Sequence, residues 1–294
     1  MLLNGDQAEL YAGSKGGLLV VWDLESCKVK ANLSGHKSQI TSLYLSKVKN
    51  APYMLASGSQ DGKLKIWDAR NYKNSSLNFK GHFESIRAIS ISPDCNYIAS
   101  GSEDKLCRLW DIRQNKLIKE FSILDQGVVN CIEFNPHCIT LAYGTSDRTV
   151  KHWDLERYQL ISVTPVDRLP ISKIKFDSSG KNLYSATSDT LKYWMVDDES
   201  PILNDNIECG WNKLQDMQYI NDDGIYGISI YGTKIALWHM PEKGSNSRSN
   251  STKEVSNILD SISNINLSND KIIVQNNYVI NNIVRIYLLT IRNK

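Results

Sequence analysis

The sequence predicts an all-β protein, a β-propeller of about six blade units, on three observations. Six of the seven tryptophans lie at positions 22, 67, 110, 153, 194 and 238, so the steps between them are 45, 43, 43, 41 and 44 residues. A period of about 40 to 45 residues is that of a four-stranded propeller blade. Short alternating runs with Gly, Asp or Ser turns precede the tryptophans, as in LASGSQDG and IASGSEDK. Such runs predict antiparallel strands joined by hairpins, and no segment has the period of a long helix.

Two further motifs recur in register with this spacing. The tryptophans at 22, 67, 110 and 153 are each followed by aspartate, and the pairs Gly35-His36 and Gly81-His82 precede Trp67 and Trp110. Gly-His, a strand and then Trp-Asp at this period is the WD-repeat pattern of a β-propeller.

Within the repeats a structural hydrogen-bond relay is expected. The indole N–H of tryptophan only donates, a serine hydroxyl can accept it and bond histidine, and the second histidine nitrogen can bond aspartate. The predicted members are His36, Ser57, Asp61 and Trp67, then His82, Ser100, Asp104 and Trp110, then Asp147 with Trp153, and Ser185 with Asp189 and Trp194. Asp125 and Asp167 stand where the later units would have histidine. His, Ser and Asp also form hydrolase triads, but repetition at a fixed offset favours the structural interpretation.

The expected domain boundaries follow the repeats. Residues 1–243 form the propeller, in which the first unit begins at about Ala8 with three strands and the last unit again has three. WD propellers commonly have about seven blades, so a first blade is expected to be missing. Residues 244–270 are Asn/Ser-rich and are expected to be a low-complexity linker. Residues 271–294 form a β-prone tail that either docks on an open propeller edge or is incidental.

Composition and charge limit the expected cell compartment and the classes of ligand. Hydrophobic residues make up 41%, no apolar run is long enough for a membrane helix, and the amino terminus lacks a secretory signal. The six cysteines form no close pair, as expected of reduced thiols in the cytoplasm. Residues 244–294 hold six Lys/Arg and three Asp/Glu, which leaves 28 basic and 29 acidic residues in the first 243. This balance argues against nucleic-acid binding by charge, and no membrane partner is expected.

No catalytic, metal or cofactor site is predicted. Cys131, His137 and Cys138 do not have a zinc-ligand spacing. The glycines between Gly13 and Gly17 lie in a hairpin and not between a strand and a helix, so they do not form a phosphate loop. The chain is therefore expected to be a binding module and not an enzyme.

From about residue 8 to residue 240 the chain resembles the regulatory, WD-repeat subunit of katanin. The resemblance rests on SDRT at 146–149, WDLE at 153–156, LYS at 183–185 and Trp211 before a last blade without the usual motifs. It implies a non-catalytic targeting subunit of the microtubule-severing complex, located on the microtubule cytoskeleton and at the spindle pole. The implied partners are the katanin AAA ATPase, tubulin and microtubules, and spindle-pole or centrosomal proteins. The helical domain with which that family binds the ATPase has no counterpart in this sequence, so direct binding of the ATPase is not implied.

Partner binding is expected on one face of the propeller. Turns between the second and third strands share this face with the loops that lead into each blade, and its candidates are Lys37, Gln60, Phe83, Glu84, Glu103, Arg148 and Arg168. Phe83 is the strongest, because aromatic anchors dominate interface hot spots, although any one position can be a solvated loop. Arg87, Arg108 and Arg113 are candidates for a basic patch toward acidic tubulin tails. The alternatives are an adaptor of a centriolar, dynein-regulating, RNA-processing or ubiquitin-ligase receptor assembly, or a truncated propeller.

Overall fold

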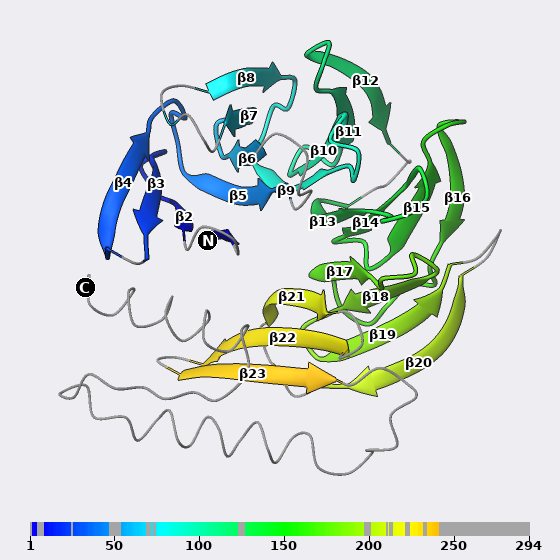
Figure 1. Cartoon of the computed structure of the whole chain (residues 1–294). Coiled ribbons are helices and arrows are strands. Elements are labelled where there is room, and N and C mark those ends of the chain that lie inside the picture. The colour runs from blue at the N-terminus through cyan, green and yellow to red at the C-terminus, as the bar shows by residue number, and fades with distance from the viewer. Residues whose placement is uncertain are drawn as a thin grey trace.

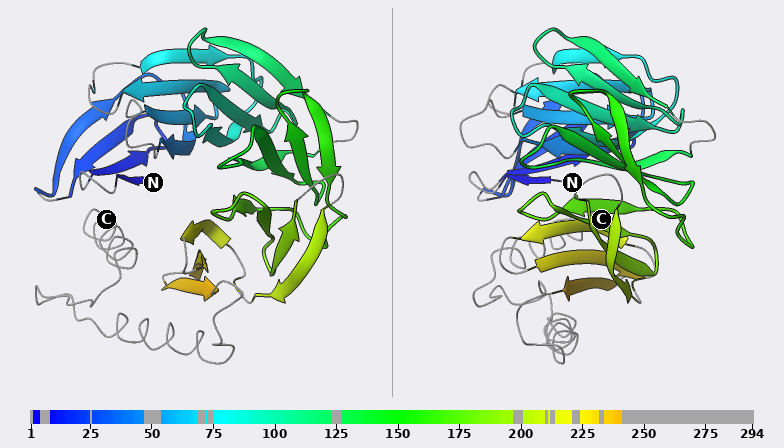
Figure 2. Two further views of the ribbon diagram at one scale, coloured as in Figure 1. Left: turned by 45° about the vertical axis from the view of Figure 1, so that its right-hand side comes forward. Right: turned by 90° about the vertical axis from the view of Figure 1, so that its right-hand side faces the viewer.

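The described part of the protein is a β-propeller of six antiparallel sheets arranged around a common centre (Figures 1 and 2). The computed structural model describes residues 2–4, 9–24, 26–46, 54–68, 72, 75–122, 127–196, 201–209, 211, 214–220, 224–231 and 234–240. The all-β class and the six blade units predicted from the tryptophan spacing are confirmed. The predicted linker 244–270 and tail 271–294 lie outside the described residues.

The first three blades contain four strands each, which run in chain order from the centre outward. Blade 1 consists of β1 (Leu2–Asn4), β2 (Glu9–Gly13), β3 (Leu19–Asp23) and β4 (Lys28–Leu33). Blade 2 consists of β5 (Ile40–Leu45), β6 (Met54–Ser59), β7 (Lys63–Asp68) and β8 (Ser75–Lys80). Blade 3 consists of β9 (Ile86–Ile91), β10 (Tyr97–Ser102), β11 (Cys107–Asp111) and β12 (Lys116–Phe121).

The last three blades follow the same order. Blade 4 consists of β13 (Val129–Phe134), β14 (Thr140–Thr145), β15 (Val150–Asp154) and β16 (Gln159–Val163). Blade 5 consists of β17 (Lys173–Phe176), β18 (Asn182–Ala186), β19 (Thr190–Met195) and β20 (Ile202–Glu208). Blade 6 consists, within the described residues, of β21 (Leu214–Ile220), β22 (Gly224–Tyr231) and β23 (Lys234–Met240).

The first blade corrects the prediction that its unit has three strands. β1 pairs with β2 in antiparallel register, with Leu2 opposite Tyr11 and Asn4 opposite Glu9, and so completes a four-stranded sheet. A segment of three residues is too short to show the alternation from which strands are predicted. Its place in the fold is decided by the neighbouring strand β2.

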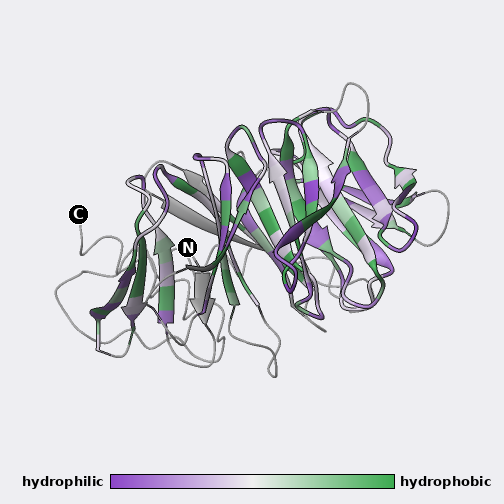
Figure 3. Ribbon diagram, turned by 90° about the horizontal axis from the view of Figure 1, so that it is seen from above, coloured by the Kyte–Doolittle hydropathy of each residue, from purple (hydrophilic) through white to green (hydrophobic). Residues whose placement is uncertain are grey.

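Burial along the strands follows their position between the blades. The second and third strands are covered on both sides, so every residue of β6 is buried, whereas the outer strand β20 is mostly exposed. Figure 3 shows hydrophobic and hydrophilic residues alternating along many strands. The core is therefore a series of apolar layers between neighbouring blades. One layer brings Phe79 of blade 2 against Trp110 of blade 3, with 5.4 Å between ring centroids, and the next brings Phe121 against Trp153 at 4.9 Å.

Blades 1 and 2 are also joined through a buried carboxylate. Glu9 is only 1% exposed, and its oxygens accept hydrogen bonds from the hydroxyls of Tyr11 (2.6 Å) and Tyr72 (2.9 Å). The ammonium group of Lys30 pairs with the same carboxylate. Tyr72 follows β7 of blade 2, so the cluster crosses the boundary between the two blades. Burial and the neighbouring carboxylate raise the pKa of Tyr11 far above its usual value, so its hydroxyl stays a donor.

We expect Glu9→Gln to lower the free energy of unfolding by about 2 kcal/mol, because one partner of a buried ionic cluster is removed. Urea unfolding of the full chain measures the effect. Glu156→Gln, at an exposed glutamate, is the control and should stay within about 0.5 kcal/mol of the wild type. Equal stability of the two variants would show that the Glu9 cluster does not stabilise the fold.

Candidate functional site

The relay of blade 2 joins four side chains in one chain of hydrogen bonds. The indole Nε1–H of Trp67 donates to Oγ of Ser57 at 2.8 Å, and the same oxygen lies 2.8 Å from Nε2 of His36. Nδ1 of His36 lies 3.3 Å from the carboxylate of Asp61. Burial lowers the pKa of His36 against the opposing effect of Asp61. The relay therefore ties the loop before β5 to β6, β7 and the turn between them.

Blade 3 repeats the arrangement and adds an arginine. Trp110 and His82 each lie 2.8 Å from Oγ of Ser100, and Nδ1 of His82 lies 2.8 Å from Asp104. The guanidinium of Arg108, 2% exposed, donates to Asp104 at 2.8 Å. Burial alone would raise the pKa of Asp104, but His82 and Arg108 hold it well below its usual range. Gly81 belongs to this packing, since a Cβ there would lie 2.7 Å from the ring of Trp110.

The serine hydroxyls of these relays are placed for structure and not for nucleophilic attack. Ser57 and Ser100 are both 0% exposed, and each oxygen already accepts the indole N–H of a tryptophan. A catalytic serine needs its oxygen within reach of a substrate carbon. The buried, doubly bonded hydroxyls do not meet that requirement, although His, Ser and Asp are connected as in a triad.

Blades 4 and 5 keep only parts of the relay. In blade 4, Tyr143 stands at the serine position, and Asp147 is bonded to Lys151 Nζ at 2.5 Å instead of joining Trp153. Burial favours the neutral acid, but hydrogen bonds from Lys151 and two threonine hydroxyls lower the pKa of Asp147 to about 2. In blade 5, Trp194 donates to Ser185 at 2.8 Å, while Asp189 accepts from Thr187. A residue at the sequence position of a relay member therefore does not always take part in a relay.

A basic residue two positions before the tryptophan recurs in four blades, and the sequence reasoning missed it. Its members are Lys65, Arg108, Lys151 and Lys192. In blades 3, 4 and 5 this cation pairs with a loop aspartate: Arg108 with Asp104, Lys151 with Asp147 and Lys192 with Asp167. In blade 2, Nζ of Lys65 lies 5.9 Å from the ring centroid of Trp67. The repeated KxW or RxW pattern is the signal from which these residues could have been found.

The relay aspartates also position the residue that follows each histidine. The backbone N–H of Lys37 donates to Asp61 at 2.8 Å, and that of Phe83 donates to Asp104 at 3.3 Å. Phe83 is 87% exposed, the most exposed large hydrophobic side chain in the described part of the chain. Cζ of Arg108 lies 5.8 Å from its ring centroid. The relay of blade 3 therefore holds an aromatic side chain in solvent at the end of the loop before β9.

We call the surface formed by the loops leading into the blades and the turns between second and third strands the loop face. Backbone bonds join the two kinds of segment within a blade, as from Gln60 N to Gln39 O and from Glu103 N to Ser85 O. The backbone of Glu84 lies beside Gly62, and Asp167 N donates to Arg148 O at 2.8 Å. All seven candidate partner-binding residues lie on this face, although spread over blades 2 to 5.

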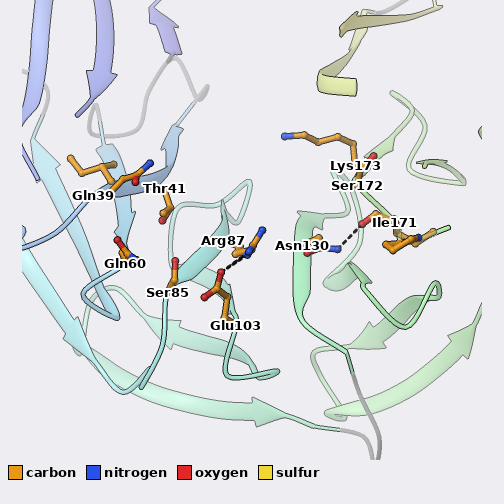
Figure 4. A pocket seen from close by; sticks show the side chains of 12 residues that line it. Gln39, Thr41, Gln60, Ser85, Arg87, Glu103, Asn130, Ile171, Ser172 and Lys173 are labelled. Atoms are coloured by element: carbon orange, nitrogen blue, oxygen red, sulfur yellow. Dashed lines mark hydrogen bonds and ion pairs between the residues drawn. The ribbon is translucent and has the colours of Figure 1, made fainter. Parts of the chain in front are cut away.

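A hollow of about 570 Å³ opens at the centre of the loop face (Figure 4). Of the candidates for partner binding only Gln60 and Glu103 line it, together with Arg87, which was predicted for the basic patch. Further lining residues, among them Asn130 and Lys173, were not singled out from the sequence. Nε of Arg87 donates to Glu103 at 2.8 Å, and Asn130 Nδ2 donates to Ile171 O at 2.9 Å. These lining residues lie in or beside the inner strands, whose side chains turn toward the centre of the ring. The sequence does not identify them as lining residues, because this position depends on how the blades assemble.

The predicted basic patch of Arg87, Arg108 and Arg113 is wrong. Arg108 is buried against Asp104 and Glu120. Arg113 follows the carboxyl end of β11, whereas the turn containing Glu103, the partner of Arg87, precedes the amino end of that strand. The three side chains therefore do not form one surface.

The cysteine and histidine residues considered as metal ligands differ in burial. Cys131 is buried, which raises the pKa of its thiol to about 12, while Cys138 and His137 are exposed. Within the described residues, no three side chains of His, Cys, Asp and Glu come together as a metal site. None of the described segments forms a helix that is long and apolar enough to cross a membrane.

Ser57→Ala should lower the free energy of unfolding by about 1–3 kcal/mol, because Trp67 Nε1 and His36 Nε2 lose their shared partner in a buried site. Urea unfolding measures the change. Ser178→Ala, at an exposed serine, is the matched control and should be neutral. If Ser57→Ala leaves the free energy of unfolding unchanged, the relay does not stabilise the fold.

Stability should fall as the pH is lowered from about 6.5 toward about 4. Burial lowers the pKa of His152 from 6.5 to about 4, so the unfolded chain binds a proton in this range that the folded chain does not. The expected slope is up to about 1.4 kcal/mol per pH unit. His152→Gln should flatten the profile of unfolding free energy against pH, and His137→Gln, at an exposed histidine, should leave it unchanged. A profile equally steep in both variants would contradict this assignment.

Comparisons with known proteins agree with this architecture. A chain in the crystal structure of the mitotic checkpoint complex superposes with a TM-score of 0.72 at 18% identity, over 82% of this chain and 74% of that chain, which shows the fold alone. The WD repeat and SOCS box-containing protein 1 of Mus musculus is 27% identical over 93 residues, 32% of this chain and 22% of the relative. The WD repeat-containing protein JIP5 of Coprinopsis cinerea is 33% identical over 85 residues, 29% of this chain and 19% of the relative.

The matched stretch thus spans about a fifth of the length of these two relatives. The family model "Nucleolar protein 10-like, N-terminal domain" matches residues 1–248. These similarities support the WD-repeat propeller and give no support to the narrower resemblance to katanin. With six blades in its described residues, tryptophan relays in blades 2 and 3 and a family match over most of its length, the chain belongs to the nucleolar protein 10-like, N-terminal domain family of WD-repeat β-propellers.

Proposed function

We propose that this chain is a non-catalytic adaptor that binds partner proteins through its loop face. The observation that carries the proposal is Phe83, a large aromatic side chain that is 87% exposed while its backbone is held by Asp104. An exposed aromatic residue whose backbone is already held loses less conformational entropy on binding than one in a mobile loop, which suits an interface hot spot. WD-repeat propellers generally act as scaffolds, and the relay serines of this one are closed to substrate.

The proposed setting is a nucleolar protein assembly. Its support is the name of the family, nucleolar protein 10-like, whose model covers residues 1–248. The expected cytoplasmic location is thereby replaced, in this proposal, by the nucleolus. The partner proteins are those that contact the loop face around Phe83.

The second candidate is the katanin targeting subunit, with the AAA ATPase, tubulin and spindle-pole proteins as its partners. Its support is the sequence resemblance at residues 146–149, 153–156 and 183–185 and at Trp211. It predicts a different set of partners and a different place in the cell, so one experiment separates the two.

We expect Phe83→Ser, introduced at the gene's own locus with an affinity tag, to lose at least one partner that the wild type recovers, by about fivefold or more. Quantitative mass spectrometry of the purified complexes measures this, and imaging of the tagged protein gives its location. Ile139→Ser is the matched control, because Ile139 is 56% exposed in a turn between β13 and β14, at the end of the blade opposite the loop face. Both variants should keep the wild-type melting temperature.

Recovery of nucleolar proteins by the wild type and their loss with Phe83→Ser would support the proposal. Recovery of an AAA ATPase with tubulin would support katanin instead. Unchanged partners in the Phe83→Ser variant would show that the loop face around this residue is not the docking surface.

A further inference from the structure

Two adjacent blades place a long basic side chain where the backbone favours glycine. In the turns of blades 2, 3 and 4, the residue after the loop aspartate has a positive φ: +71° at Gly62, 66° at Lys105 and 72° at Arg148. Glycine adopts this conformation freely, whereas a residue with a Cβ adopts it at a cost. Lys105 and Arg148 are both exposed, so burial in the core does not account for the size of either side chain.

Arg148 has a second arginine beside it. The backbone N–H of Asp167 donates to the carbonyl of Arg148 at 2.8 Å, which brings Arg168, the next residue in the chain, to the same junction of blades 4 and 5. The carboxylate of Asp167 is buried and pairs with Lys192 at 2.9 Å. Among the residues that the structure describes, no carboxylate forms an ion pair with Arg148 or Arg168, and both are exposed. Two exposed arginines therefore lie at one junction of the loop face.

Exposed apolar groups border these cations. Phe83 is bonded through its backbone to Asp104, the residue before Lys105, and Val166, 60% exposed, lies two residues before Arg168. The loop face over blades 3 to 5 thus carries exposed basic residues, Lys105, Arg148 and Arg168, together with two exposed apolar residues, Phe83 and Val166. Of the carboxylates on this part of the face, Glu103 is already paired with Arg87.

We propose that the loop face over blades 3 to 5 binds an acidic segment of a partner protein, whose apolar residues contact Phe83 and Val166. This inference rests on the proposed adaptor function and names the chemistry of the partner. Charge complementarity across an interface guides association and selects the partner. An acidic peptide fits better than a nucleic acid, because apolar side chains of a peptide can pack on the exposed Phe83 and Val166. Binding of a nucleic acid needs many Lys and Arg contacts to phosphates, and Glu84 lies exposed among the few cations of this face.

The test uses the full chain and a fluorescein-labelled peptide of about twenty residues with a Glu-Asp-Gly-Phe repeat, followed by fluorescence anisotropy. Arg148→Gly combined with Arg168→Ser should weaken binding by about tenfold, and added salt should weaken wild-type binding. Arg113→Ser combined with Arg157→Ser removes the same charge from turns at the other end of the blades and should leave the affinity within about twofold.

Stability gives an independent readout. Because glycine suits the positive φ at position 148, Arg148→Gly should keep or raise the melting temperature while it weakens peptide binding. A loss of binding with an intact fold would show that the arginine is retained for the ligand and not for the turn.

Three outcomes would overturn the proposal: equal binding by the wild type and the loop-face variant, an equal loss in the Arg113/Arg157 control, or tighter binding of a single-stranded RNA of the same charge than of the peptide. If Phe83→Ser loses protein partners but the peptide shows no dependence on Arg148 and Arg168, the adaptor function stands and the acidic partner does not.

Discussion

In blades 2, 3 and 5 the fold depends on the burial of a tryptophan whose ring and whose N–H have opposite requirements. The ring of Trp110 packs on Phe79 of the preceding blade at 5.4 Å, which removes a large apolar surface from water. The indole N–H would be costly to bury alone, and Ser100 accepts it at 2.8 Å. Burial of this indole therefore needs both interactions. Stacking of the blades removes the ring from water, and the polar relay supplies a hydrogen-bond acceptor for the N–H.

The same relay controls what the molecule presents to solvent. Its terminal aspartates, Asp61 and Asp104, bond both the histidine and the backbone of the residue after it. Where the histidine is absent, in blades 4 and 5, lysine and aspartate pairs hold the loops instead: Lys151 with Asp147 and Lys192 with Asp167. Buried charges are stable only when paired in this way. The loops of the loop face are thus fixed by interactions that begin in the core.

Neutralised carboxylates explain how a chain of balanced charge can have a basic loop face. The aspartates of the turns in blades 2, 3 and 4 are paired with histidine, arginine or lysine, while Arg148 and Arg168 are exposed. The total charge of the first 243 residues therefore says little about this surface. A binding preference for acidic protein segments is compatible with a protein that shows no overall excess of basic residues.

The sequence by itself determined the all-β class, the six blade units and the residues of the two complete relays, because the tryptophan period and the Gly-His and Trp-Asp motifs are local and repeated. It did not reveal β1, since three residues carry no period, nor the Glu9 cluster, whose members come from two blades. The burial of Arg108 and the meeting of Arg148 with Arg168 were also decided only by the tertiary structure. The Glu9 cluster and the junction at Arg148 and Arg168 depend on contacts between segments that are distant in sequence, and the burial of Arg108 depends on how the strands around it pack. No local pattern encodes these contacts.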